Sequence, residues 1–278
     1  MSTQKIGLSI ILLAASICAD VSFDTSMSGC KYYDSWQVRN RLDWALAQRL
    51  YQQHWIGRIS NNRGTIPRII HQIWLSGPLP QKYEKFQRSW QQHHPDWQYR
   101  LWTDADVESF GLKNKVAFDA ARNWGQKSDI FRYEILQRYG GLYVDCDFEC
   151  LKPFDEIHDA CDFYAGVAYG AVVTLYNGLI GARPGHPVID QCVANISLNE
   201  IHQDEFLNTL HTTGPMYFTR CFFTVIEQCN DRAVIFPVSF FYPWPDYARH
   251  LPLARIYTLS KPETVAIHHW HTAWMEGG

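Results

Sequence analysis

Apolar residues in this chain fall into short continuous runs that alternate with segments of three-to-four spacing. Residues 66–75 (IPRIIHQIWL) are mostly apolar and β-branched and lie between Gly64 and Gly77, which predicts a buried strand of a parallel sheet. Residues 97–102 (WQYRLW) alternate in polarity as a strand does. The same reasoning predicts helices over residues 35–54 and 83–93, and a third that begins at residue 103.

Strands that alternate with helices indicate an α/β fold, with a mostly parallel, right-handed sheet and helices on both faces. In such folds, ligands bind outside the carboxyl ends of the strands. The second half of the chain is less regular and is interpreted as the acceptor-side half of the same domain. It contains Asn177-Gly178, residues 184–187 (PGHP), Thr213-Gly214-Pro215 and residues 242–245 (YPWP).

The N-terminus has Lys5, a 14-residue apolar run (IGLSIILLAASICA, residues 6–19) and then Asp20. This order predicts a signal peptide over residues 1–19, a helical extension over residues 20–64 and one large domain over residues 65–278. A short signal-anchor or a buried segment are the alternatives, and no other stretch is long and apolar enough to span a bilayer. We therefore expect an exported or secretory-pathway protein, including a secreted effector, with a cytoplasmic protein as the alternative.

Composition narrows the function classes. The 278 residues are 46% hydrophobic and 19% charged, with a net charge of −3, which argues against a nucleic-acid partner. Eleven tryptophans, 15 tyrosines and 15 phenylalanines favour carbohydrate binding or, alternatively, a ring-rich core. No pair of the eight cysteines has CxxC spacing, so a zinc site is not expected.

The most informative segment covers residues 128–153 (SDIFRYEILQRYGGLYVDCDFECLKP). It predicts a helix capped by Ser128 and ended by Gly140, then a short buried strand with Asp145 and Asp147 at its exit. Residues two apart in extended chain face the same way, so both carboxylates point to one side while Cys146 packs on the other. Two carboxylates on one side suit Mn²⁺ or Mg²⁺ together with phosphate oxygens.

Spacing alone is a weak signal, because Asp104 and Asp106 repeat the same DxD pattern. They follow Thr103 at a helix start, where carboxylates cap backbone N–H groups. We therefore interpret this second pair as structural.

Two further groups support a site at the first pair. Asp129 and Arg132 share a face of the preceding helix, where they form either a surface ion pair or a grip on sugar hydroxyls. Residues 268–271 (HHWH) place three histidines in four positions. One of them is expected to complete a metal site; His269 is the first choice, with His268 and His271 left open.

The segment at residues 128–153, together with five others along the chain, resembles glycosyltransferase family 32. That family includes the yeast initiating α-1,6-mannosyltransferase and has the clostridial glucosylating toxins as distant relatives. The resemblance covers residues 66–274, and its most specific block is SDxxRY…GGxYxDxD. The other similar segments are IPRIIHQIWLSGPLP, WTDADVESF, NGLIGARPGHPVI, TGPMYFTR and HHWHTAW.

The resemblance implies a GT-A fold, retention of anomeric configuration and a UDP- or GDP-linked sugar donor. It assigns Trp74 to base stacking, Asp129 and Arg132 to the donor sugar, and Tyr143 to the donor site. It further implies that Asp145 meets the ribose and sugar, directly or through water and metal, that Asp147 and His269 ligate the metal, and that Trp274 contacts the diphosphate. Relatives often have Ser-Trp where this chain has Ala273-Trp274, and Thr272 is the candidate replacement for the serine.

The sequence thus predicts a metal-dependent retaining transferase that moves a hexose (mannose, glucose, galactose or GlcNAc) to a hydroxyl of a glycan, lipid or protein. Asn177 is the candidate acceptor-side residue. The alternatives are a metal-dependent phosphohydrolase, which uses more acidic ligands around two metals, and a non-catalytic sugar-binding module of the same fold.

Overall fold

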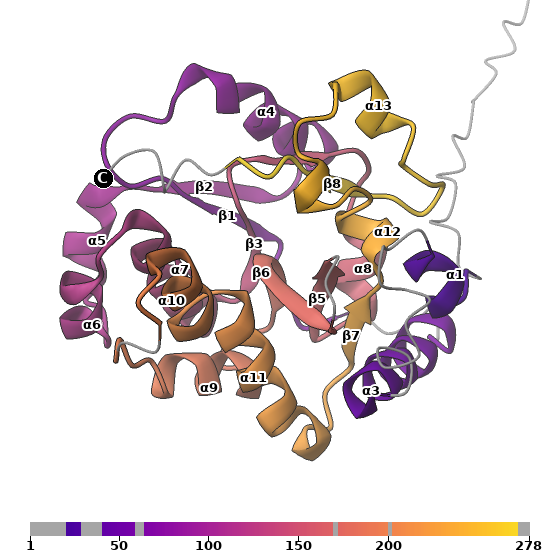
Figure 1. Cartoon of the computed structure of the whole chain (residues 1–278), viewed down its shortest axis with the longest axis horizontal. Helices are drawn as coiled ribbons and strands as arrows, with labels where there is room; N and C mark the ends of the chain where they lie inside the picture. Colours follow the sequence, from indigo (N-terminus) through magenta and orange to yellow (C-terminus); the bar gives the residue numbers. More distant parts are fainter. Residues whose placement is uncertain (1–20, 29–40, 59–63, 169–171, 200–201, 272–278) are drawn as a thin grey trace, which may run out of the picture.

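The computed structural model describes residues 21–28, 41–58, 64–168, 172–199 and 202–271. Its centre is a six-stranded sheet in the order β2-β1-β3-β6-β5-β7 (Figure 1). Within this sheet β6 alone runs against its neighbours, so the predicted mostly parallel sheet is confirmed. The strands are β1 (Ile69–Ile73), β2 (Gln98–Trp102), β3 (Gly141–Val144), β5 (Phe163–Ala168), β6 (Thr174–Ala182) and β7 (Ala233–Phe236).

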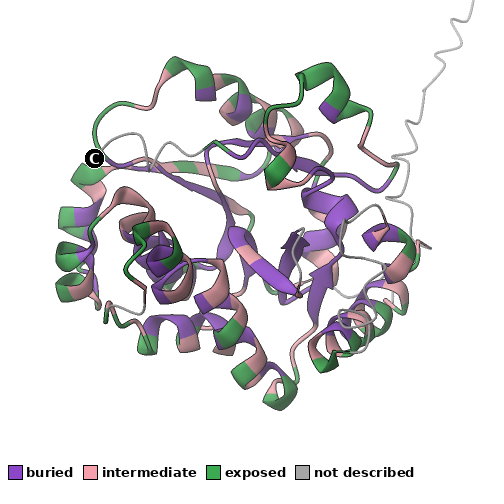
Figure 2. Ribbon diagram, in the orientation of Figure 1, coloured by how far each residue is buried: buried purple, intermediate pink, exposed green. Residues whose placement is uncertain are grey.

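Both faces of the sheet are covered, because β3, β5 and β7 are buried along their whole length (Figure 2). Helices α7 (Trp124–Tyr139), α9 (Pro187–Ala194), α10 (Glu205–Thr212) and α11 (Pro215–Val225) pack together beside β3 and β6 (Figure 1). The remaining helices are α4 (Glu84–His93), α5 (Asp104–Phe110), α6 (Lys115–Ala120), α8 (Asp155–Ala160), α12 (Val238–Phe241) and α13 (Leu253–Tyr257). Single turns are η2 (Gln81–Tyr83), η3 (Ile226–Gln228) and η4 (Asp246–Ala248).

The helix before the acidic pair starts earlier than predicted. Asn123, not Ser128, is its N-cap, because the Asn123 side chain accepts a hydrogen bond from the Gln126 N–H. Its end is as predicted: Gly140 has φ 61°, a conformation that favours glycine and turns the chain directly into β3.

The N-terminal helices α1 (Phe23–Met27), α3 (Leu42–Leu50) and the π-helical η1 (Tyr51–Ile56) belong to the same hydrophobic core as the sheet. The Trp55 ring packs edge-on against Phe236 of β7, with 5.0 Å between ring centroids. Residues 1–19, the predicted signal peptide, lie outside the described residues. Across the part of the chain that is described, no helix has the length and apolarity needed to cross a bilayer.

A second sheet has two antiparallel strands, β4 (Phe148–Cys150) and β8 (Ala266–His268). In their register Phe148 lies opposite His268. This pairing carries the late histidine segment to the turn that follows β3, although the two lie about 120 residues apart in sequence.

Candidate active site

The acidic pair lies in a tight turn at the carboxyl end of β3. The Phe148 N–H donates to the Asp145 carbonyl at 3.1 Å, and the Asp145 N–H donates to the Gly178 carbonyl at 2.8 Å. Both carboxylates line one cavity, as predicted, but the turn brings them together rather than the alternation of an extended strand. Cys146 packs against Tyr83 and Phe86, although it also borders the cavity.

His268, not His269, is the histidine beside the acidic pair. Its Nε2 lies 3.1 Å from the Asp147 Oδ1, and ligand atoms of Asp145, Asp147 and His268 all lie within 4.8 Å of one another. The His269 ring points to the opposite side, where its Nε2 lies 2.9 Å from Glu149 Oε2 and the ring stacks on Phe86. The choice of His269 is therefore corrected, because neighbouring side chains along this extended segment face opposite ways.

The pKa values of the two carboxylates in this cluster shift in opposite directions. The pKa of Asp145 is raised overall. Burial and the negative charge of Asp147 raise it, and the positive charge of Arg132 opposes them. Burial also favours the neutral form of Asp147, but the charge and hydrogen bond of His268 and the His271 N–H outweigh it and lower the pKa. The pKa of His268 is raised, because the attraction of Asp147 exceeds the opposing effect of burial.

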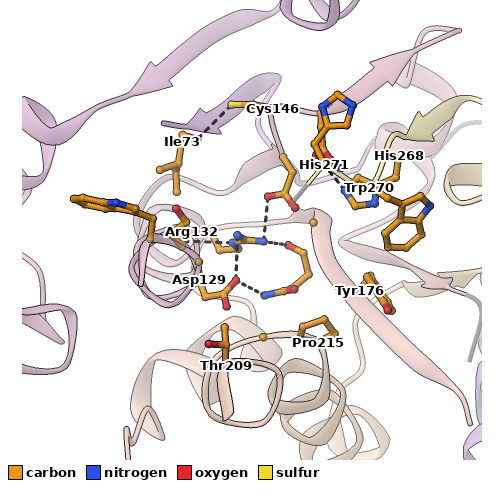
Figure 3. A pocket seen from close by; sticks show the side chains of 18 of the residues that line it. Ile73, Asp129, Arg132, Cys146, Tyr176, Thr209, Pro215, His268, Trp270 and His271 are labelled. Atoms are coloured by element: carbon orange, nitrogen blue, oxygen red, sulfur yellow. Dashed lines mark hydrogen bonds and ion pairs between the residues drawn. The ribbon is translucent and has the colours of Figure 1, made fainter. Parts of the chain in front are cut away.

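Arg132 is the centre of a buried polar network on the other side of the cavity (Figure 3). Its Nη2 lies 3.0 Å from Asp129 Oδ1, and its Nη1 lies 3.3 Å from Asp145 Oδ1. Nη1 also donates to the Asn177 carbonyl at 2.7 Å, and the guanidinium lies over the Tyr143 ring. Tyr143 in turn donates its hydroxyl to Asp145 Oδ1 at 2.7 Å, so the network fixes the orientation of that carboxylate.

Asp129 is held by donors on both oxygens. Asn177 Nδ2 donates to Oδ1 at 2.8 Å, and the Thr213 hydroxyl donates to Oδ2 at 2.9 Å. The pKa of Asp129 is raised to about 6, because the effect of burial exceeds the lowering effects of Arg132, Thr213 and Asn177. Asn177 also donates to the Tyr133 hydroxyl at 3.0 Å, so its side-chain oxygen is the atom left to meet a ligand.

Of the three predicted site residues not yet discussed, Trp74 is among the described residues. Trp74 lines the cavity and packs against Tyr83, with 5.0 Å between ring centroids. Trp274 and Thr272 lie outside the described residues. Across the cavity from Arg132 stand His268, Trp270 and Tyr176 (Figure 3), a wall that also includes Asp246 and Arg249.

The second DxD pair is structural, as predicted. Asp106 and Thr103 form a capping box at the start of α5. Asp104 accepts hydrogen bonds from the N–H groups of Ser76 and Gly77, and so holds the loop that follows β1.

Sequence reasoning missed Gly178 and Thr213. A Cβ at Gly178 would lie 2.6 Å from Asp145 Oδ2, so glycine here leaves room for that carboxylate. The pair Asn177-Gly178 is typical of a turn between elements, yet it lies within β6. Thr213 begins the segment TGPMYFTR, which is part of the family resemblance but does not by itself indicate what Thr213 does.

The cluster of Asp145, Asp147 and His268 suits a divalent cation. It offers carboxylate oxygens and an imidazole nitrogen, a donor set that Mn²⁺ accepts, within reach of one ion. His268 Nδ1 is buried without a hydrogen-bond partner among the described residues, so the ring is not committed to other protein groups at both nitrogens. These residues fit a metal-binding role.

Comparison with known proteins gives the family. A family model described as "glycosyltransferase sugar-binding region containing DXD motif" matches residues 80–164. An uncharacterized glycosyltransferase of Acanthamoeba polyphaga mimivirus is 32% identical over 181 residues, which cover 61% of this chain and 70% of that protein. The chain belongs to the DXD-motif glycosyltransferases.

Other members of this glycosyltransferase family are longer. Inositol phosphoceramide mannosyltransferase 3 of Schizosaccharomyces pombe is 30% identical over 165 residues, 58% of this chain and 46% of that protein. The chain thus spans about half the length of this curated relative. Among solved structures, the PaToxG glycosyltransferase aligns with a TM-score of 0.48 at 18% identity, over 65% of this chain and 76% of that one. The mostly parallel sheet with helices on both faces is the architecture expected of the predicted GT-A fold, and the DXD turn follows β3, the third strand in the sheet order.

Proposed function

We propose that this chain is a metal-dependent, retaining hexosyltransferase that uses a nucleotide diphospho-sugar. The observation that carries the proposal is the meeting of two groups in one cavity. The cluster of Asp145, Asp147 and His268 supplies a place for a divalent cation, and the Asp129–Arg132–Asn177 network faces it with fixed polar atoms.

In this proposal Asp145, Asp147 and His268 hold the cation, with Mn²⁺ as the first choice and Mg²⁺ as the second. A bound divalent cation supplies Lewis-acid stabilisation of the negative charge that a departing diphosphate acquires. Arg132 holds Asp145 in place and adds a buried positive charge beside the sugar position. The fixed orientation of these groups matters, because preorganised charges need no rearrangement when the reaction occurs.

The remaining cavity residues bind and orient the substrates. Trp74 offers a ring face to the nucleobase, and Tyr143 lines the donor site next to Asp145. Asp129 and the Asn177 side-chain oxygen can accept hydrogen bonds from sugar hydroxyls. Among the described cavity residues we propose no dedicated nucleophile: the acceptor hydroxyl attacks from the leaving-group side, and a phosphate oxygen takes its proton.

Mannose is the first donor sugar to test, since the Schizosaccharomyces pombe relative is named as a mannosyltransferase. That relative also makes a phosphoinositol lipid the first acceptor to test, with glycan and protein hydroxyls next. The predicted secretory-pathway or exported location stays a proposal.

The deciding experiment measures nucleoside diphosphate release across UDP- and GDP-sugars with Mn²⁺, with and without acceptors. Release that depends on an acceptor supports transfer, whereas equal release without one supports the phosphohydrolase alternative, and none supports a binding module. With the active donor, Asp147→Asn should lower turnover at least ~100-fold, the scale for losing a preorganised charge. Wild-type turnover by a folded Asp147→Asn protein at saturating Mn²⁺ would refute the metal assignment.

The structure does not favour the phosphohydrolase. Among the described residues there is one cluster of three potential metal ligands, whereas two-metal hydrolases need carboxylates around a second ion.

A further inference from the structure

The segment from Asp246 to Tyr257, here called the rim, carries an unusual share of the exposed apolar side chains. Of the eight large hydrophobic residues that are exposed among the described residues, four lie in this stretch of twelve. They are Tyr247, Leu251, Leu253 and Tyr257, with exposed fractions of 55%, 38%, 46% and 43%. Figure 2 shows the helix at its centre, α13, as largely exposed. Such clustering marks a surface that contacts a partner.

The rim is anchored to the domain at a few points rather than buried in it. Ile256 is its one fully buried apolar side chain, and the Tyr257 hydroxyl donates to Glu149 Oε2 at 2.8 Å. These contacts hold α13 against β4, while Leu251 and Leu253 remain exposed. The apolar side chains are therefore presented on a fixed support.

The rim also stands at the mouth of the active-site cavity. A groove lined by Leu251, Leu253 and Ile256 shares Arg249, Trp270 and His271 with that cavity. A partner seated on the rim would thus lie next to the position of the acceptor.

Basic groups alternate with the apolar ones. Arg249, His250 and Arg255 lie between Tyr247 and Tyr257, and Lys82 lies across the groove. The one acidic residue of the rim, Asp246, is paired with Arg249. With His250 neutral, Arg249 and Arg255 against Asp246 leave the rim a net charge of +1, although the whole chain has a net charge of −3.

We propose that the rim docks on an anionic phospholipid bilayer. Leucine and tyrosine side chains enter the boundary between headgroups and acyl chains, while Arg255 binds the anionic headgroups. A second copy of this chain is a poorer occupant, because a two-fold interface would place the same positive rim against itself. The proposal deepens the proposed function, since docking in this way presents the cavity to acceptors that lie in the membrane.

The test uses the full chain and vesicles of phosphatidylcholine with or without phosphatidylserine. Because the apolar run at residues 6–19 can bind vesicles by itself, the primary readout is local: hydrogen exchange of peptides that cover residues 246–257. We expect protection there with phosphatidylserine vesicles, weakened by high salt. Absence of protection in this segment, or protection confined to other segments, would overturn the proposal.

A variant pair gives the second readout. Leu251→Ser with Leu253→Ser should reduce this local protection at least ~10-fold, because two inserting side chains are lost. The matched control is Leu42→Ser with Val116→Ser. These two apolar residues lie outside the rim and are more exposed than Leu251 and Leu253, so their substitution should leave the protection unchanged. Equal protection in both variants, or rim-dependent self-association without vesicles, would contradict docking on lipid.

Failure of docking and failure of transfer can be told apart. Nucleoside diphosphate release with a soluble acceptor does not need the bilayer, so the rim variant should keep it. Transfer that persists while residues 246–257 stay unprotected would reject the docking surface and leave the proposed function in place.

Discussion

A single added methyl group at Gly178 should disable the site without unfolding the protein. In Gly178→Ala the new Cβ would lie 2.6 Å from Asp145 Oδ2, so that oxygen must move by roughly 0.8 Å to reach ordinary contact. The atoms nearest to that Cβ belong to the Asp145 carboxylate and the edge of the Phe148 ring, and Gly178 does not have a positive φ. The carboxylate can rotate away, so we expect the free energy of unfolding to change by less than ~1 kcal/mol.

Activity should respond far more strongly. Rotation of Asp145 breaks its bonds to Tyr143 and Arg132, and a misplacement of ~1 Å can cost about 100-fold in rate, equivalent to roughly 2.7 kcal/mol of barrier. The assay is acceptor-dependent nucleoside diphosphate release, together with calorimetric melting and Mn²⁺ titration.

The contrasting variant is Gly181→Ala on the same strand. Its Cβ would lie 2.1 Å from the buried Tyr164 ring, so this variant should lose stability instead. Wild-type turnover and Mn²⁺ affinity in Gly178→Ala would refute the reasoning, because they would show that the position of the Asp145 carboxylate does not matter.

Three other predictions test separate parts of the structure. Trp74→Ala should weaken donor binding ~10-fold or more by calorimetry, because base stacking on a ring is lost; unchanged affinity would count against stacking. His268→Ala should lower Mn²⁺ affinity at least ~10-fold while His269→Ala leaves it close to wild type, and the reverse order would move the ligand back to His269. Burial lowers the pKa of His71 to about 4, so its ring should stay neutral at pH 5.5 in an NMR titration. The stability that neutral His71 provides is complete above pH ~6.5 and is lost as the pH falls towards 4, so an ordinary titration midpoint near 6.5 would contradict the assignment.

Local signals explain what the sequence predicted well. The strand at residues 69–73, the stop at Gly140 and the capping role of Asp106 depend on near neighbours in the chain. The acidic turn could also be located, because an apolar strand and two carboxylates define it without distant information.

Distant pairing explains what was missed. Which histidine faces Asp147 depends on the register of β8 against β4, and nothing in the sequence HHWH states that register. Gly178 looks like a turn residue until β6 places it against Asp145. The predicted start of α7 is wrong because Asn123 and Ser128 are both good cap residues, and it is the Asn123 side chain that accepts a hydrogen bond at the helix start.

The pairing of β4 with β8 makes the proposed metal site depend on the tertiary fold. Asp147 and His268 come from segments about 120 residues apart, so their ligand atoms meet only when the whole domain is assembled. A peptide of residues 128–153 would carry both aspartates and still lack the site, unlike a calcium-binding loop that carries its ligands within one short stretch. At the proposed cation site, affinity is therefore a reporter of native tertiary structure, and its loss in a variant points to the ligands only when the fold is verified separately.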